Sequence, residues 1–212
     1  MTENNNLIGD NGSESSLSII TKLRKHPKSL QIQTYLTEKF DRERYEHIYS
    51  VQETAVRLAI CHNADVWKTH LAALLHDVAK WMCDDELYQS VSRYNIQLDP
   101  IEEQMPALLH AIVGVKYAID LFEVTDLEVL EAIRCHTTGN ASMGLIAKLI
   151  YVADFSEPNR EYSEAERVRE VAVNNLDQAV HDVACYKIGF LLKKGWIIHP
   201  NTIHTYNDSL VK

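Results

Sequence analysis

The chain has 212 residues, of which 46% are apolar and 24% are charged, with only 7 Gly and 5 Pro. These fractions are typical of one soluble globular domain and exclude a collagen-like chain, a repeat array or wholesale disorder. A formal charge of -9 argues against broad binding of nucleic acid or anionic membranes, which depends on clustered Lys and Arg. A site for an anionic substrate therefore needs a local source of positive charge.

The N-terminal region differs in composition from the rest of the chain. Residues 1–16 are polar, and they lack the basic start and apolar stretch of a secretory signal. No apolar run is long enough to span a bilayer, so we expect a cytoplasmic protein. We expect residues 1–27 to be a poorly ordered or accessory extension that precedes a single domain at 28–212.

The periodicity of the apolar residues predicts helices from residue 17 onward, and no segment alternates with period 2 for long enough to suggest a sheet. One helix carries His47, a second covers 66–78, and Pro106 suits the first position of another. The last long helix is expected at 176–194, followed by a loop at 196–207 that closes over the bundle. The predicted fold class is all-α, a helical bundle.

Polar residues before the apolar runs predict several helix starts. Residues 125–128 (TDLE) read as a capping box for a helix that runs to about His136. Ser142 is expected to cap the next helix, and residues 163–166 (SEAE) form a second capping box. The four cysteines contain no CxxC pair and are expected to be reduced thiols in the core: Cys61, Cys83, Cys135 and Cys185.

A His-Asp pair at 76–77 is the first indication of chemistry. The dipeptide alone is weak evidence, because the chain has 10 His and a second such pair at 181–182. The first pair differs from the second because further candidate ligands occur around it at helix-length intervals in the sequence: His47, His110, His136 and Asp154. Each belongs to a separate predicted helix, so a bundle could point all of them inward. We interpret His181-Asp182 as an ordinary pair.

Four imidazoles and two carboxylates are too many ligands for one tetrahedral zinc. Mixed N and O donors with a bridging carboxylate suit two divalent or trivalent ions; iron is expected first, with manganese, cobalt or magnesium as alternatives. Two such ions can hold a hydroxide and clamp a phosphoryl oxygen. The residues therefore predict hydrolysis of a phosphoester or phosphoanhydride, with the ions supplying the local positive charge.

Five motifs in order carry a family resemblance: RYEH (44–47), LHDVAK (75–80), LHA (109–111), RCHTTG (134–139) and YVADFSEPNR (151–160). Together they resemble the HD-domain phosphohydrolase superfamily and, more narrowly, its bacterial YqeK branch, which the tail motif IHPNT (198–202) also matches. The resemblance covers about residues 28–207. It implies a helical bundle with a metal site in its core.

The resemblance also implies an activity and a ligand set. Members of that branch cut diadenosine tetraphosphate symmetrically into two ADP. Carried over by position, one ion is held by His47, His76, Asp77 and Asp154, and Asp77 bridges to a second ion held by His110 and His136. Asn140 stands where the family often has a basic residue.

Four side chains near the ligands are expected to act beside Asp77. Lys80, one turn beyond His76, could lean toward a phosphate, as could the guanidinium of Arg160. His199 could donate to a phosphate or protonate the leaving group, and Thr137 could bind substrate. We expect Asp77, Lys80, Arg160 and His199 to be catalytic, and Lys80, Thr137, Arg160 and His199 to contact substrate.

Three of these side chains also have a plain structural reading, and for Thr137 the sequence leaves open a capping role or a substrate contact. Lys80 could be a solvated lysine at a helix end, Arg160 could pair with Glu157 or Glu161, and His199 could anchor its loop. No aromatic residue is assigned to the nucleobase, because aromatics at these spacings are more often packing residues.

Two other hypotheses about function stay open. Another nucleotide, such as a deoxynucleoside triphosphate or a guanosine alarmone, could be the substrate, since a fold does not determine a substrate. Alternatively, the chain could be a non-catalytic nucleotide-binding module that its metals stabilise. The partner expected in every case is a nucleotide, with no nucleic acid and no membrane. The oligomeric state, a homodimer included, is left open.

Overall fold

The computed structural model describes residues 15–210, and this part of the chain is helical without any strand. The prediction of an all-α fold is therefore confirmed. None of the described helices is long and apolar enough to cross a membrane. The elements are α1 (Ser16–Arg24), α2 (Pro27–Lys39), α3 (Arg42–Cys61), α4 (Val66–Leu75), α5 (Asp84–Arg93), η1 (Glu102–Gln104), α6 (Pro106–Phe122), α7 (Leu127–Cys135), α8 (Leu145–Ser156), α9 (Ser163–Ala172), α10 (Leu176–Lys194) and α11 (Pro200–Leu210).

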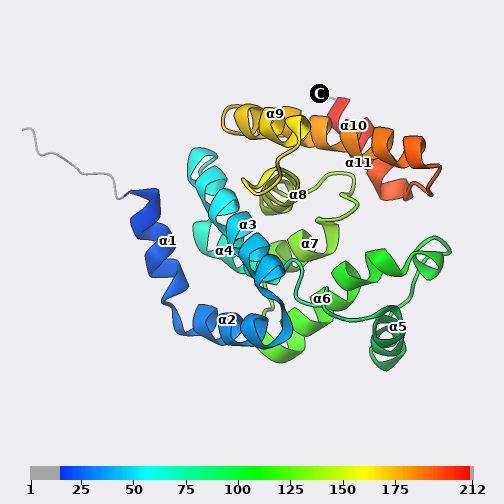
Figure 1. Cartoon of the computed structure of the whole chain (residues 1–212), viewed down its shortest axis with the longest axis horizontal. Coiled ribbons are helices and arrows are strands. Elements are labelled where there is room, and N and C mark those ends of the chain that lie inside the picture. Colours follow the sequence, from blue (N-terminus) through cyan, green and yellow to red (C-terminus); the bar gives the residue numbers. More distant parts are fainter. Residues whose placement is uncertain (1–14, 211–212) are drawn as a thin grey trace, which may run out of the picture.

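Helix α8 lies at the centre of the bundle, with α3 and α4 on one side and α9 and α10 on the other (Figure 1). Nine of its twelve residues are apolar, and residues 149–153 are fully buried. A helix that is apolar on all sides is stable only when other helices surround it. Burial of α8 therefore also fixes the position of Asp154 near its C-terminal end.

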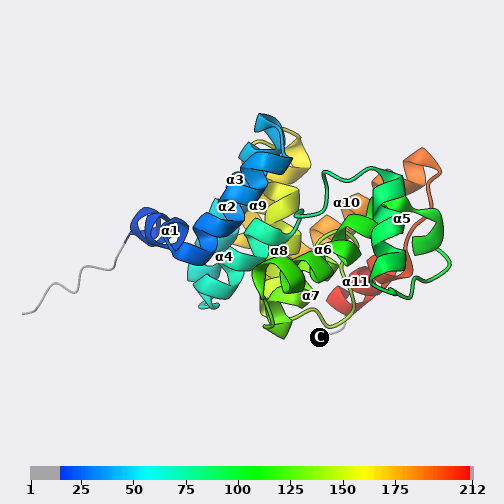
Figure 2. The ribbon, with the colours of Figure 1, turned by 90° about the horizontal axis from the view of Figure 1, so that it is seen from below.

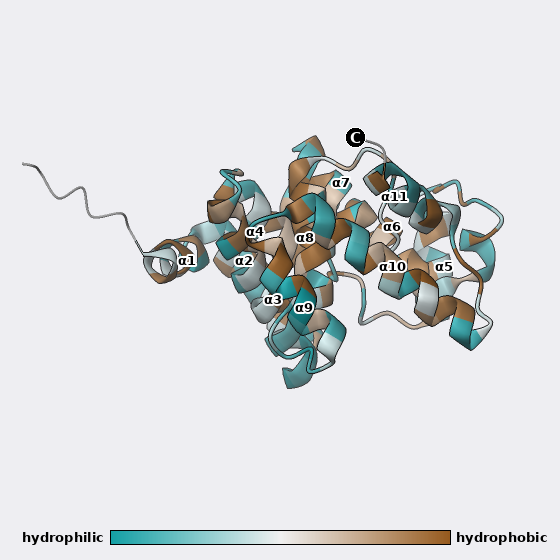
Figure 3. Ribbon diagram, turned by 90° about the horizontal axis from the view of Figure 1, so that it is seen from above, coloured by the Kyte–Doolittle hydropathy of each residue, from teal (hydrophilic) through white to brown (hydrophobic). Residues whose placement is uncertain are grey.

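The remaining helices arrange their apolar faces around this centre. In Figure 3 the brown, apolar residues gather on α8 and its neighbours, whereas much of α9 is teal. Seen from below, α1 lies at one end of the molecule and α5 at the other (Figure 2). Helices α5 and α6 enclose a smaller apolar cluster that includes Leu87, Leu109 and Val113. The main core thus carries the helices that hold the predicted ligands, while α5 extends beyond it.

Several expected caps are wrong in detail. Asp126, not Thr125, caps α7, because its carboxylate accepts from the backbone N–H groups of Glu128 and Val129. Ser142 has φ 54 and lies two residues before the N-cap of α8, which is Gly144. Ser163 is already the first residue of α9, so the expected second capping box does not form.

The expected loop at 196–207 is also wrong, because Pro200 begins helix α11. Proline suits the first turn of a helix, where no backbone N–H donor is needed. The N–H of Asn201, which has no partner within the helix, donates to His199 Nδ1. Helix α10 does end as expected at Gly195, which takes a left-handed conformation at φ 65.

The expected extension at residues 1–27 is described only from Ser15 onward, and residues 1–14 lie outside the described part. Helix α1 contacts α3: Ile20 is buried, and Arg24 Nε donates to Gln52 Oε1 at 2.8 Å. All four cysteines are free thiols. The prediction that all of them lie in the core is wrong, since Cys61 and Cys83 are exposed.

Candidate metal centre

His76 and Asp77 reach the centre of the bundle because α4 stops at Leu75. The chain then continues in tight turns, in which the N–H of Val78 donates to the carbonyl of Leu75 and that of Lys80 to Asp77. Adjacent side chains on a regular helix diverge by about 100°. The tighter turn lets both side chains face the same interior site, where His76 is fully buried and Asp77 is 4% exposed.

The other four predicted ligands come from four further helices. His47 lies on α3, His110 on α6, Asp154 on α8, and His136 immediately follows α7. Apolar neighbours on each helix turn these polar side chains inward, and all but the partly buried Asp154 are buried. The structure brings the six side chains together as two groups of three: His47, His76 and Asp154, and Asp77, His110 and His136.

The first group has donor atoms that face one another without hydrogen bonds. Asp154 Oδ1 lies 3.2 Å from His47 Nε2 and 3.9 Å from His76 Nε2. Both imidazole nitrogens are buried and have no hydrogen-bond partner. Because an unpartnered buried nitrogen is costly, this group fits a bound cation.

The second group is arranged around one oxygen of Asp77. Asp77 Oδ1 lies 3.2 Å from His110 Nε2 and 3.4 Å from His136 Nε2, and these two nitrogens are 3.1 Å apart. The other oxygen, Oδ2, lies 3.7 Å from His76 Nε2, on the side of the first group. The carboxylate of Asp77 therefore stands between the two groups, as a bridging ligand would.

The second nitrogen of each imidazole determines which nitrogen faces the site. Nδ1 of His76, His110 and His136 donates to the backbone carbonyl three residues earlier, at 2.7, 2.7 and 2.8 Å. His47 Nδ1 instead donates to Glu157 Oε1 at 3.1 Å. A carbonyl or carboxylate only accepts, so Nδ1 carries a proton in all four rings, and each ring in its neutral form presents the lone pair of Nε2. This is the arrangement in which imidazoles bind metals.

The electrostatics of the site divide the histidines. Burial lowers the pKa of His76 to about 4 and also lowers the pKa of His110, so both are neutral at pH 7, as ligation requires. Burial also opposes the charged form of His47. The carboxylates of Asp154 and Glu157 outweigh it and raise the pKa of His47 to about 9. In the absence of a cation, His47 would balance part of this negative charge.

Four cationic side chains surround the six ligands. Arg44 Nη1 donates to Asp77 Oδ2 at 3.0 Å, and Arg160 Nη2 lies 3.6 Å from Asp154 Oδ1. Lys80 Nζ lies 3.2 Å from His110 Nδ1. Lys187 Nζ donates to the carbonyl of Thr137 at 2.8 Å, and burial lowers its pKa to about 8. A chain with net charge -9 thus concentrates positive charge at this site.

Thr137 and His199, two of the expected substrate contacts, differ in how they lie relative to the ligand groups. Thr137 Oγ1 lies 3.1 Å from His136 Nε2, at the edge of the second group. Both ring nitrogens of His199 are occupied, Nε2 by Asp99 at 3.0 Å and Nδ1 by the N–H of Asn201. A phosphate contact from His199 therefore requires that its bond to Asp99 opens.

The second His-Asp pair lies elsewhere. His181 Nδ1 contacts Ser209 Oγ at 2.9 Å, between α10 and α11, and its ring stacks on Tyr206. Asp182 accepts from Gln178 on its own helix. Neither residue belongs to either group of candidate ligands.

Sequence reasoning missed three residues of this site as functional: Arg44, Glu157 and Lys187. Arg44 and Glu157 lie inside the quoted motifs, where their position near His47 and Asp154 was a usable signal. Lys187 carried no such signal, because it is one of several lysines on α10 and only the packing of that helix directs it to the site.

A helical bundle with six inward-facing His and Asp side chains in this order is the site of an HD-domain protein. Residues 44–159 match the model of the HD domain, and this stretch contains all six candidate ligands. The chain belongs to the HD domain family.

More specific relatives cover most of the chain. The symmetrical bis(5'-nucleosyl)-tetraphosphatase of Halalkalibacterium halodurans is 39% identical over 87% of this chain and 97% of its own. The protein of the same name from Bacillus subtilis is 36% identical over 80% of this chain and 91% of its own. A crystal structure of an HD superfamily hydrolase from Clostridium acetobutylicum superposes with a TM-score of 0.82 at 34% identity, covering 85% of this chain and 95% of that one.

Proposed function

We propose that this protein hydrolyses diadenosine tetraphosphate symmetrically into two ADP, using two metal ions held by the six clustered side chains. The observation that carries the proposal is the pair of ligand groups joined by Asp77, whose two oxygens face opposite groups. The names of relatives at 36–39% identity support the choice of substrate. Iron is our first choice of metal, with manganese, cobalt or magnesium as alternatives.

The chemistry is an in-line displacement at phosphorus. Two bound divalent ions would lower the pKa of a coordinated water and neutralise charge on the phosphoryl oxygens. Water oxygen adds to one β-phosphorus, the bond from that phosphorus to the central bridging oxygen breaks, and the second ADP leaves with that oxygen. Each product is therefore an ADP.

The chain's own residues bind and orient the tetraphosphate. Lys80 contacts His110 of the second group, and Arg160 contacts Asp154 of the first group. The two side chains can therefore hold phosphate oxygens on both sides of the scissile bond. Thr137 can donate a hydrogen bond from the edge of the second group. His199 would join them as an acid or phosphate donor once its bond to Asp99 opens.

The test is product analysis with purified protein, diadenosine tetraphosphate, and iron, manganese or cobalt. We expect ADP as the only nucleotide product, and we expect Asp77→Asn to abolish its release. Asp182→Asn is the matched control, because it changes the aspartate of the second His-Asp pair outside the site. Release of ATP and AMP, or faster turnover of a deoxynucleoside triphosphate or guanosine alarmone, would overturn the proposal.

A further inference from the structure

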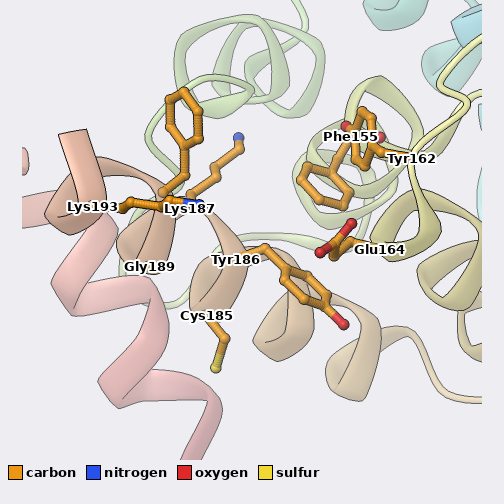
Figure 4. Close-up of a pocket in the computed structure, with 9 residues that line it drawn as sticks. Phe155, Tyr162, Glu164, Cys185, Tyr186, Lys187, Gly189 and Lys193 are labelled. Carbon is orange, nitrogen blue, oxygen red and sulfur yellow. Dashed lines mark hydrogen bonds between the residues drawn. The ribbon is translucent and has the colours of Figure 1, made fainter.

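A cavity of about 630 Å³ lies between the C-terminal end of α8, the start of α9 and one face of α10 (Figure 4). Pockets for small organic ligands have volumes of about 300–1,000 Å³, so this one is large enough for a nucleoside. Four of its nine lining residues are aromatic, and the residues used below are Phe155, Tyr162, Glu164, Tyr186, Lys187 and Phe190.

The cavity adjoins the candidate metal centre. Phe155 directly follows the ligand Asp154 on α8. Lys187 and Phe190 line both this cavity and a second hollow, which Asp154 and Thr137 also line. The two hollows thus share Lys187 and Phe190 in their walls, and the second hollow reaches the ligand Asp154.

The aromatic side chains present faces for stacking. The rings of Phe155 and Tyr186 are nearly parallel, at 10° with centroids 6.0 Å apart, and Tyr162 packs edge-on to Phe155 at 5.4 Å. Tyr162 is 41% exposed and Phe190 is 52% exposed. Large aromatics grouped at an accessible cavity favour a flat ligand, and a nucleobase stacks on such rings whatever its identity.

The charges at the cavity match the two ends of a nucleotide. Among the described residues that line the cavity, Glu164 is the only one with a carboxylate, and it can accept a hydrogen bond from an amino group on a base. Lys187 lies on the side of the metal centre, where phosphates would pass. We propose that this aromatic cavity binds one nucleoside of the dinucleotide substrate, with the phosphates extending past Lys187 to the six ligands. The inference rests on the proposed function, because the dinucleotide supplies the phosphates.

Binding of ADP and of pyrophosphate to the manganese-loaded protein tests this assignment by calorimetry. We expect Tyr186→Leu and Phe190→Ala each to raise the Kd for ADP about tenfold, the effect of losing one stacking ring, and to leave the Kd for pyrophosphate within about twofold. Tyr186→Phe keeps the ring and should bind ADP like the wild type. Leu192→Ala is a second control, since Leu192 lies on the same helix, is 66% exposed and does not line the cavity.

The outcomes separate the cavity from the proposed reaction. The nucleoside assignment is overturned if the wild type does not bind ADP or if ADP binds the ring-deleted variants normally. It is also overturned if these variants bind pyrophosphate as much more weakly as they bind ADP. Should Tyr186→Leu fail to fold, the exposed Phe190 still carries the test. Hydrolysis of the dinucleotide is assayed in parallel. If the dinucleotide is hydrolysed but the ring deletions leave ADP binding unchanged, only the cavity assignment is overturned. If the ring deletions weaken ADP binding but the dinucleotide is not hydrolysed, only the proposed reaction is overturned.

Discussion

Glu157 offers a way to perturb one half of the candidate metal centre. Its side chain is 2% exposed, and Oε1 accepts the Nδ1 proton of His47 at 3.1 Å. The other three histidines donate to backbone carbonyls, which no substitution removes. Glu157→Gln therefore weakens the orientation of His47 alone among the four imidazoles, and we expect it to weaken one metal site and spare the other.

The magnitude follows from the bond that is lost. The change replaces a charged acceptor by a neutral amide of nearly the same size. Loss of an outer partner of a ligating histidine typically costs about 10–100-fold in metal affinity, or roughly 1.4–2.7 kcal/mol. That range agrees with one buried hydrogen bond to a charged group, about 1.5–3 kcal/mol. Arg160 Nε, which lies 3.7 Å from Glu157 Oε1, would lose part of its ion pair as well.

The assay is manganese binding by calorimetry together with elemental analysis of the loaded protein. We expect two sites in the wild type, and in Glu157→Gln one unchanged site with a second site weakened 10–100-fold. Glu161→Gln is the matched control, since Glu161 is exposed in the same loop and contacts neither histidine group. Equal weakening of both sites, or no weakening at all, would refute the assignment of Glu157 to His47.

Three further predictions concern stability and site membership. Burial lowers the pKa of His70 to about 3, so only the unfolded state takes up its proton between about pH 6.5 and 3, and stability should fall by roughly 3–5 kcal/mol as the pH drops through that range. Denaturation at several pH values should show a shallower fall in His70→Gln, and equal slopes would contradict this. Gly139→Ala should lower the free energy of unfolding, measured in denaturant, by about 1–3 kcal/mol more than Gly195→Ala. Both glycines have positive φ, but only the Cβ added at Gly139 would meet a side chain, at 2.2 Å. Identical losses would exclude the steric term. By elemental analysis, His76→Ala should lose bound metal, whereas His181→Ala should keep it. Loss of metal in both variants would contradict the conclusion that only the first His-Asp pair binds metal.

Much of the candidate site could be predicted from the sequence, because its ligands belong to ordered local motifs. The types and spacing of His47, His110 and Asp154 suffice to propose two ions without any coordinates. The helices that carry them can also be predicted from the sequence, because an apolar stripe with period 3.6 indicates a buried helix face whichever element packs against it. Cap residues were less predictable: Ser142 and Asp126 compete with neighbours of similar capping ability, and small differences in local geometry decide between them.

The sequence by itself determined that the chain is a helical bundle and which six side chains gather in it, because both depend on residue type and spacing along the chain. Only the tertiary structure decided the proton positions on the imidazoles, the convergence of Arg44 and Lys187 on the site, and the helix at Pro200–Leu210. Those features arise from contacts between segments far apart in sequence. Side-chain direction there is set by packing, which no local pattern records.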